Sequence, residues 1–249
     1  MRRSLSWRAG LVCSLMATAL LSGCATTRQP DPLEPLNRAT FAFNEKVDEF
    51  LIEPPARVYR DVVPRVVRQG VTNFFGNLRD AWSAVNLVLQ GRPGDGIQDA
   101  MRFSINTVFG FGGVLDWASE MRLEPHREDF GQTLGRWGVG PGAYLVLPML
   151  GPSNLRDTAA LPLDLRAEIE FHVDDVATRN SLTGLRVLSL RSNLLDTSKL
   201  LDGIALDKYL FVRDAYLQRR RSLIYDGNPP AEPDDEGEPP APSAPRAQP

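Results

Sequence analysis

Ser153, His126 and Asp129 are one combination of the residue types that a serine hydrolase uses. In hydrolases of the α/β type the nucleophilic serine stands in a G-x-S-x-G turn, which exposes its hydroxyl to the substrate. Ser153 stands in Gly151-Pro-Ser-Asn-Leu155, where the second glycine is absent. The residues therefore give a lipid hydrolase only weak support.

The sequence indicates neither a metal site nor a nucleotide-binding loop. His126 and His172 are far apart, and neither has a second histidine or a cysteine at the spacing of zinc ligands. The run Gly138-Val-Gly-Pro-Gly142 leads into an apolar extended segment, whereas a dinucleotide-binding loop leads into a helix. We expect no cofactor.

Cys24 is the residue whose surroundings predict a specific reaction. It follows three arginines and the apolar run 9–21, which is the order of an export signal. The residues Leu21-Ser-Gly-Cys24 resemble a bacterial lipobox, at which the cysteine is acylated and becomes the new first residue. Cys13 leaves with the signal, so the mature chain keeps one cysteine and cannot form an internal disulfide. We expect residues 1–23 to be a lipoprotein signal peptide that is removed.

The acyl chains expected on Cys24 would hold the protein on a membrane, because each buried CH₂ contributes about 0.8 kcal/mol. Residue 25 is alanine, whereas an aspartate there resembles the signal that keeps Gram-negative lipoproteins in the inner membrane. The expected location is the periplasmic side of the outer membrane. Residues 24–30 form a short polar linker, which would keep the folded body close to the bilayer.

The charge of the chain excludes nucleic acid as a partner. The formal net charge is −3, and most of the acidic excess falls in the tail 227–249, so the body between linker and tail is close to neutral. Nucleic-acid binding needs a basic surface that this body lacks. The tail contains proline, alanine and acidic residues without any aromatic side chain, so we expect it to be disordered.

Hydrophobic periodicity predicts a single, mainly α-helical domain over residues 31–226. Gly70 and Gly76 fall inside the longest helical pattern, where they are expected to mark a bend or a close helix contact. The expected helices are one from Asn37 that Pro54-Pro55 ends, a long one over 64–89 with Pro64 in its first position, one through 97–108, a short one over 115–121, a turn capped by Ser153 and stopped by Pro162, helices within 173–201, and a last one from about Asp207.

The stretch 131–152 holds more helix breakers than any other part of the body. Its glycines permit positive φ and its prolines remove N–H donors, so no helix is expected to run through it. Tyr144-Leu-Val-Leu-Pro-Met-Leu150 is apolar and bounded by turn signals, which favours an extended piece. We expect an apolar hairpin or a shaped loop here.

Several spaced motifs resemble the MlaA (VacJ) family of outer-membrane lipoproteins. The resemblance is strongest at Glu128-Asp-Phe-Gly-Gln-Thr-Leu-Gly135 with Gly138-Val-Gly-Pro-Gly142. Residues 158–206 match little, and Lys208 stands where a proline is common. The other matching motifs are Asp31-Pro-Leu-Glu34 with Asn37-Arg38, Asn73-Phe-Phe-Gly-Asn-Leu78, Leu89-Gln-Gly91, Asn106-Thr107, Gly110-Phe-Gly-Gly113 and Val212-Arg-Asp-Ala-Tyr-Leu-Gln-Arg-Arg220.

The resemblance implies a ring-like, membrane-embedded body in the inner leaflet of the outer membrane, with an amphipathic channel for phospholipid. It also implies a function. Such a lipoprotein removes mislocalised phospholipids from the outer leaflet, maintains lipid asymmetry, associates with trimeric porins and passes lipid to the periplasmic carrier MlaC. The alternative is a structural lipoprotein that scaffolds porins or the cell wall.

The loop 131–152 is expected to shape or gate the lipid path, with the helix from Asn37 at its border. Arg219 and Arg220 are candidate headgroup contacts, although arginines at the end of a helix also complement its dipole. The candidate path or gate residues are Asn44, Phe74, Phe75, Gly138, Gly140, Gly142, Tyr144 and Leu147.

Overall fold

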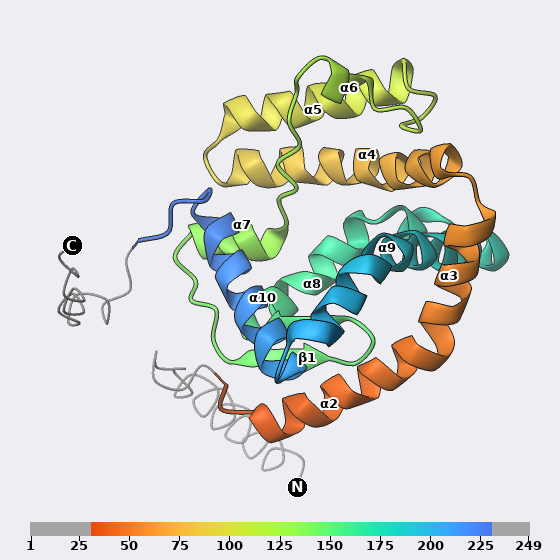
Figure 1. Ribbon diagram of the computed structural model, residues 1–249. Helices are drawn as coiled ribbons and strands as arrows, with labels where there is room; N and C mark the ends of the chain where they lie inside the picture. Colours follow the sequence, from red (N-terminus) through yellow and green to blue (C-terminus); the bar gives the residue numbers. More distant parts are fainter. Residues whose placement is uncertain (1–30, 231–249) are drawn as a thin grey trace, which may run out of the picture.

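The computed structural model describes residues 31–230 (Figure 1). Cys24, the signal peptide, the linker and most of the acidic tail lie outside the described residues. Within them the domain is mainly helical, which confirms the expected fold class. The elements are α2 (Glu34–Val47), a π-helical turn (Asp48–Ile52), α3 (Glu53–Val62), α4 (Arg65–Leu89), α5 (Pro93–Val108), α6 (Trp117–Glu120), α7 (Phe130–Arg136), β1 (Tyr144–Leu147), β2 (Gly151–Asn154), α8 (Leu155–Ala167), a 3₁₀ turn (Ile169–His172), α9 (Val176–Ile204) and α10 (Lys208–Ile224).

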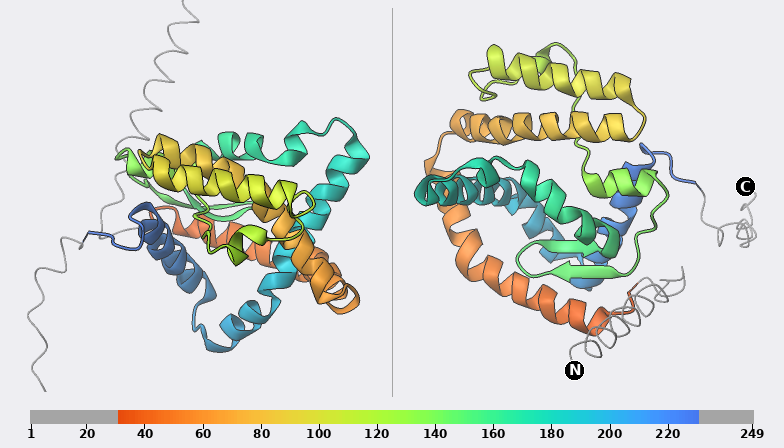
Figure 2. Two further views of the ribbon diagram at one scale, coloured as in Figure 1. Left: turned by 90° about the horizontal axis from the view of Figure 1, so that it is seen from above. Right: turned by 180° about the vertical axis from the view of Figure 1, so that it is seen from behind.

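The helices follow one another around the molecule. In Figure 1, α2, α3 and α4 run along three sides, and α7 with α10 closes the fourth. Helix α5 packs along the outside of α4. Helices α8 and α9 fall within this frame in Figure 1 and in the view from behind, while the view from above shows α9 crossing from one face of the frame to the other (Figure 2). None of the described helices combines the length and the apolarity that a bilayer crossing requires.

The prediction that Pro54-Pro55 ends the first helix is wrong. The chain widens into the π-helical turn after α2 and continues directly as α3, with the two prolines in the first turn of α3. A first helical turn needs no N–H donors, so proline is tolerated there. The guanidinium of Arg191 from α9 donates to both carboxylate oxygens of Asp48 at 2.7 Å, which ties the wide turn to α9. The result is a bend between α2 and α3.

Two predictions around the central stretch are also wrong. A short helix, α7, occupies its beginning, and Gly131 and Gly135 lie within it. Further on, Asn154 and not Ser153 caps α8, and α8 runs through Pro162. An internal proline costs about 3 kcal/mol relative to alanine. Packing of α8 against α7 and β2 offsets that cost.

The long helix over 64–89 is confirmed, one residue shorter at its start because Pro64 is the N-cap of α4. Gly70 marks a close contact as predicted, since a Cβ there would meet Val114 Cγ1 at 2.9 Å. Gly76 does not, because a Cβ there would meet nothing within 4 Å. The start of α10 at Lys208, capped by Asp207, is also confirmed.

The contact between α4 and α5 is polar and buried. The side chain of Arg102 on α5 is 4% exposed, and its Nε donates to Asp80 Oδ2 on α4 at 3.0 Å. Its other nitrogens bond to Asp116, to Ser119 and to the carbonyl of Leu123. The arginine therefore joins α4, α5, the cap of α6 and the loop that follows α6.

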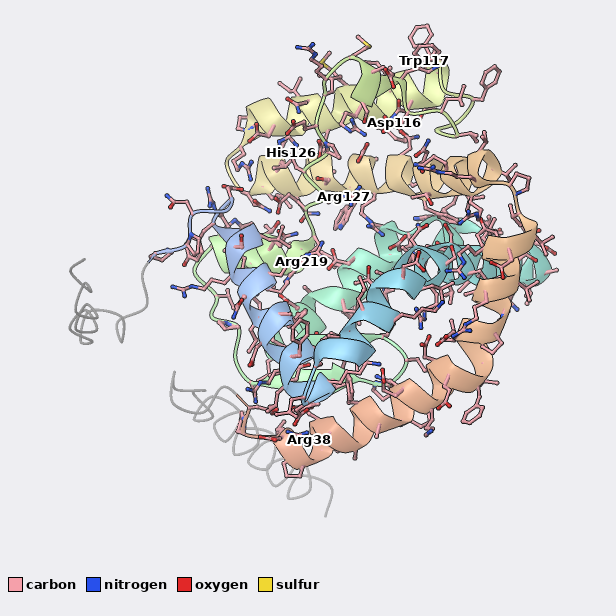
Figure 3. The ribbon with its side chains drawn as sticks, viewed as in Figure 1. Arg38, Asp116, Trp117, His126, Arg127 and Arg219 are labelled. Carbon is pink, nitrogen blue, oxygen red and sulfur yellow. The ribbon has the colours of Figure 1, made fainter. Side chains whose placement is uncertain are left out.

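The outer surface, in contrast, is rich in apolar side chains. Among residues 31–230, large apolar side chains are more often exposed than buried, while many fully buried residues are polar. Trp117 projects outward from the α5 and α6 side of the molecule (Figure 3). Large exposed apolar areas mark surfaces that meet a membrane or a partner. The exposed apolar residues of α4, α5 and the loops around α6 are Val66, Val67, Val85, Val88, Leu89, Ile97, Met101, Val108, Phe109, Phe111, Val114, Leu115, Trp117 and Met121.

The Asp80 carboxyl in the α4 and α5 contact leads to a prediction about pH. Burial raises its pKa to about 6, against the opposing attraction of Arg102. A carboxyl whose pKa is higher in the folded state stabilises the fold at low pH, and this contribution is lost as the pH rises through 6. We compare the free energy of unfolding of the wild type with that of Asp80→Asn. The difference in favour of the wild type should be larger at pH 4 than at pH 7 by about 2 to 3 kcal/mol.

Parallel denaturant titrations of the two proteins at both pH values would measure this difference. Asp61→Asn is the control, because the carboxylate of Asp61 is exposed on α3. A difference between wild type and Asp80→Asn that stays constant with pH would show that the Asp80 carboxyl is ionised throughout this range.

Candidate functional site

An apolar hairpin lies between α2 and α10, as the central stretch predicts. Strands β1 and β2 are antiparallel, with Tyr144 opposite Asn154 and Leu147 opposite Gly151. The turn between them, Pro148-Met-Leu150, exposes the side chains of Met149 and Leu150. Its apolar tip is thus open at the surface, while its base is held by the helices.

Two asparagines of α2 bind the free edge of β1. Asn37 Nδ2 donates to the carbonyl of Tyr144 at 2.9 Å, and Asn37 Oδ1 accepts from the N–H of Val146 at 2.9 Å. Asn44 repeats this pattern at the turn. Its Nδ2 donates to the carbonyl of Leu147 at 2.9 Å, and its Oδ1 accepts from the N–H of Met149 at 2.8 Å. The two side chains replace a neighbouring strand.

Tyr144 anchors the inner face of the hairpin. It is 1% exposed and packs in an aromatic cluster with Tyr209 and Tyr216 of α10, at ring-centroid distances of 6.3 and 6.0 Å. Phe41 of α2 completes the cluster with an edge contact to Tyr209. Burial raises the pKa of Tyr144 to about 12. Tyr144 therefore fixes the hairpin to α2 and α10.

Arg220 lies in a network behind the hairpin. Its guanidinium donates to both oxygens of Asp129, at 2.5 and 2.9 Å, and its Nε lies 2.8 Å from Asp157 Oδ2 in an ion pair. Asp157 also accepts from the hydroxyl of Tyr216 at 2.7 Å. Burial alone would raise the pKa of Asp157, but Arg220 and Tyr216 hold that pKa below its usual value. The network joins α7, α8 and α10.

The glycines of the loop before β1 differ in what they require. Gly142 has φ +66°, and a Cβ there would lie 2.9 Å from Leu155 Cβ. Gly138 has φ +91° but open space around it. Gly140 has neither constraint, since a Cβ there would meet nothing within 4 Å and its φ is not positive. Of these three glycines, Gly142 alone combines a glycine conformation with close packing.

The structure thus brings together part of the predicted path or gate. Asn44, Tyr144, Leu147 and Gly142 belong to the hairpin and its supports. Phe74 and Phe75 stack edge to face at 5.2 Å on α4, the helix across the molecule from the hairpin (Figures 1 and 2). Arg219 is exposed on α10 (Figure 3). The headgroup roles of Arg219 and Arg220 stay predictions.

Asn37 is the supporting residue that the sequence analysis did not single out as part of the site. The signal was present, since Asn37 and Asn44 are seven residues apart and so lie on one face of a helix, two turns apart. An apolar strand with a free edge needs such donors and acceptors.

Ser153, His126 and Asp129 do not form a catalytic triad. The hydroxyl of Ser153 shares a hydrogen bond with Thr158 at 2.9 Å. His126 Nδ1 lies 2.8 Å from Asp99 Oδ1, and Asp129 caps α7 and pairs with Arg220. Among residues 31–230 no group of three or more His, Cys, Asp or Glu side chains is arranged to hold a metal ion.

Comparison with known proteins gives this arrangement a context. A family model described as "MlaA lipoprotein" matches residues 29–223, which includes the hairpin and nearly all of the described helical body. The chain belongs to the MlaA lipoprotein family. The resemblance seen in its motifs is thereby confirmed.

Relatives within the MlaA family match over most of their length. The proteins named "Intermembrane phospholipid transport system lipoprotein MlaA" from Shigella flexneri and from Escherichia coli K12 are each 39% identical over 223 residues, covering 85% of this chain and 87% of the relative. The protein of that name from Haemophilus influenzae is 32% identical over 230 residues, covering 87% of this chain and 91% of the relative.

A solved structure supports the MlaA fold. It is described as "Structural basis for maintenance of bacterial outer membrane lipid asymmetry" and superposes with a TM-score of 0.68 at 36% sequence identity. The match covers 78% of this chain and 98% of the other.

The hydrogen bonds by which Asn37 and Asn44 of α2 hold β1, here called the clamp, lead to a second prediction. Asn37→Ala removes three hydrogen bonds and leaves the N–H of Val146 and the carbonyl of Tyr144 unpaired in a buried place. We expect this change to lower the free energy of unfolding by about 2 to 3 kcal/mol. Hydrogen exchange at the Val146 amide should accelerate. Thr40→Ala is the control, because the Thr40 hydroxyl donates only to Leu36 within α2. Unchanged exchange at Val146 would contradict the clamp.

Proposed function

We propose that this protein is an outer-membrane lipoprotein that removes mislocalised phospholipids from the outer leaflet and passes them to the periplasmic carrier MlaC. Three relatives from Gram-negative bacteria carry the name of an intermembrane phospholipid transport system. Acylation of Cys24 would place the body at the membrane, and trimeric porins are the partners that we propose for it there.

The observation that carries this proposal is the distribution of apolar and polar side chains. Large apolar side chains are exposed on α2, α4 and α5, while many of the fully buried side chains are polar. A body embedded in one leaflet needs an apolar exterior, and a phospholipid headgroup needs polar groups along its way through hydrocarbon. Movement of lipid through such a body requires no covalent chemistry, so we propose no enzymatic activity.

The first experiment measures outer-leaflet phospholipid in cells that lack the gene. Surface-exposed phospholipid is quantified through its acylation by an outer-membrane acyltransferase, in cells complemented with wild type or with Cys24→Ala. We expect excess surface phospholipid that only the acylatable form corrects. No excess in the deleted strain would favour the scaffold alternative.

Within this function we propose that the hairpin and the loop before it shape or gate the lipid path. Gly142→Ala introduces a Cβ at positive φ, which costs about 1 to 2 kcal/mol, and it pushes against Leu155 at the start of α8. We expect Gly142→Ala to raise outer-leaflet phospholipid and detergent sensitivity. Gly140→Ala is the matched comparison within the same loop. Gly140 is also a candidate gate residue, but its Cβ would have space, so we expect a much smaller effect than from Gly142→Ala. Wild-type lipid levels in cells with Gly142→Ala would refute the gate.

A further inference from the structure

Two adjoining cavities lie between α4 and α8. One, of about 170 Å³, is lined by charged residues of α4, α8 and the loop before α7. The other, of about 360 Å³, is a shallow hollow that is more open to the surface and is lined mainly by apolar side chains of the same two helices, among them Ala81 and Leu163. Leu78, Trp82 and Ala167 line both, so the two spaces form one site with a polar and an apolar part.

The carboxylates of the polar part already have partners. Arginines offset the charge of three of them, with Arg92 lying 3.7 Å from Glu128, whereas Asp164 accepts from neutral donors only. Gln90 donates to Glu128, Arg220 to Asp129, the indole N–H of Trp82 and the backbone N–H of Phe130 to Asp164, and Arg186 pairs with Glu168.

The two arginines of the polar part are different. Arg79 of α4 and Arg127 of the loop before α7 both line the cavity. Within residues 31–230 the structure gives neither guanidinium a hydrogen bond or an ion pair, whereas Arg220 and Arg186 nearby are engaged. Both side chains are exposed, so they offer two guanidinium groups that no described side chain engages and that an anion can bind.

The backbone holds Arg127 in this place at a cost. Arg127 has φ +61°, the left-handed region that is unfavourable for a side chain with a Cβ. Both of its neighbours bond to the helix pair of α4 and α5. His126 bonds to Asp99 of α5, and the N–H of Glu128 donates to the Ser83 hydroxyl of α4 at 2.9 Å.

The side chains of His126 and Arg127 consequently lie on different sides of α4. Figure 3 shows His126 between α4 and α5, and Arg127 on the side of α4 that faces α8. Backbone strain of this kind persists where the surrounding structure enforces it, and it gathers at ligand sites.

We propose that this two-part site binds a glycerophospholipid, with its headgroup phosphate between Arg79 and Arg127 and an acyl chain along Leu78 and Leu163. The inference rests on the proposed function, because it assigns a binding site to the lipid that the protein is proposed to carry. A cavity of about 170 Å³ is smaller than typical sites for whole ligands, so it suits one end of a larger molecule. The adjoining apolar cavity suits the other end.

The test uses the full-length acylated protein in detergent micelles and a phosphatidylethanolamine with a photoreactive diazirine in its acyl chain. Adducts are located by peptide mass spectrometry. We expect wild type to carry adducts at residues 78–82 and 163–167, and Arg79→Gln with Arg127→Gln to reduce them about tenfold, as loss of charge-assisted bonds predicts. Arg65→Gln is the matched control, an exposed arginine of α4 that does not line the cavity.

A second variant separates binding from folding. Arg127→Gly relieves the positive φ, so it should raise the midpoint of thermal unfolding while it lowers the adduct yield. A purely structural arginine would not give these opposite effects. If Arg127→Gly or the double variant kept the wild-type adduct yield at both segments, the site would be refuted.

Two further measurements identify the ligand and distinguish failure of this site from failure of the proposed transport function. Excess inorganic phosphate should displace the lipid poorly, because it lacks the chain that fills the apolar part; displacement as complete as by unlabelled lipid would assign the site to free phosphate and overturn the proposal. Wild-type adducts found only elsewhere, as at the hairpin, would refute this site and leave phospholipid transport standing. No adduct anywhere would refute both.

Discussion

Replacing Arg102 with methionine should lower the free energy of unfolding by about 3 to 5 kcal/mol, the cost of breaking a buried ion pair by removing one partner. Methionine fills much of the same volume but leaves the carboxylates of Asp80 and Asp116 without their cation. It also leaves the Leu123 carbonyl without its donor. The midpoint of thermal unfolding, followed by circular dichroism of the purified lipoprotein, should fall by about 10 °C.

Two matched proteins test this explanation. Arg57→Met removes an exposed arginine whose pair with Glu53 lies within α3, and such pairs contribute less than about 1 kcal/mol. The second is Arg102→Met combined with Asp80→Asn. It removes the buried Asp80 carboxylate that has lost its cation, and it should recover part of the lost stability. If Arg57→Met and Arg102→Met were equally harmful, burial of the network would not be the cause.

The sequence predicted the elements whose signal is local. The apolar repeat of α4, the start of α10 near Asp207 and the apolar run of β1 all appear where the pattern places them. Burial of one apolar face suffices to form such an element, and its period can be read directly from the chain.

The errors arose where tertiary contacts outweigh a local cost. Gly131 and Gly135 weaken a helix by about 1 kcal/mol each, which argued against α7. In the structure their missing Cβ atoms let α7 approach its neighbours, since a Cβ at Gly131 would lie 2.6 Å from Asp157 Oδ1 and one at Gly135 would lie 2.8 Å from Ile224 Cδ1. These glycines were interpreted as residues that end a helix, but in the structure they allow close packing of α7. One sequence alone does not distinguish these two roles of glycine.

The polar interior was equally hidden from the sequence. Arg102 and Asp80 lie on different helices, so no periodicity links them. Arg127 carries no signal of its left-handed backbone. For the site, the hairpin was predicted because apolar extended residues and turn signals are local, whereas the contact of Asn44 with it and the cavity between α4 and α8 depend on how distant segments meet.

Replacing Arg220 with methionine is the other change with a large expected effect. The side chain is 13% exposed and bridges Asp129, the cap of α7, to Asp157 in the first turn of α8. Removal leaves the two carboxylates without the cation between them, which should cost about 3 to 5 kcal/mol. Because the network lies behind the hairpin, we also expect excess outer-leaflet phospholipid in cells that carry this variant.

Arg219→Met is the matched control, because the neighbouring side chain is exposed on the same helix. It should change stability by less than about 0.5 kcal/mol. Arg220→Lys should fall between the two, since a lysine keeps the charge but not the forked contact to both oxygens of Asp129. If Arg219→Met and Arg220→Met raised surface phospholipid equally without loss of stability, both arginines would act on lipid headgroups, and the network would not explain the role of Arg220.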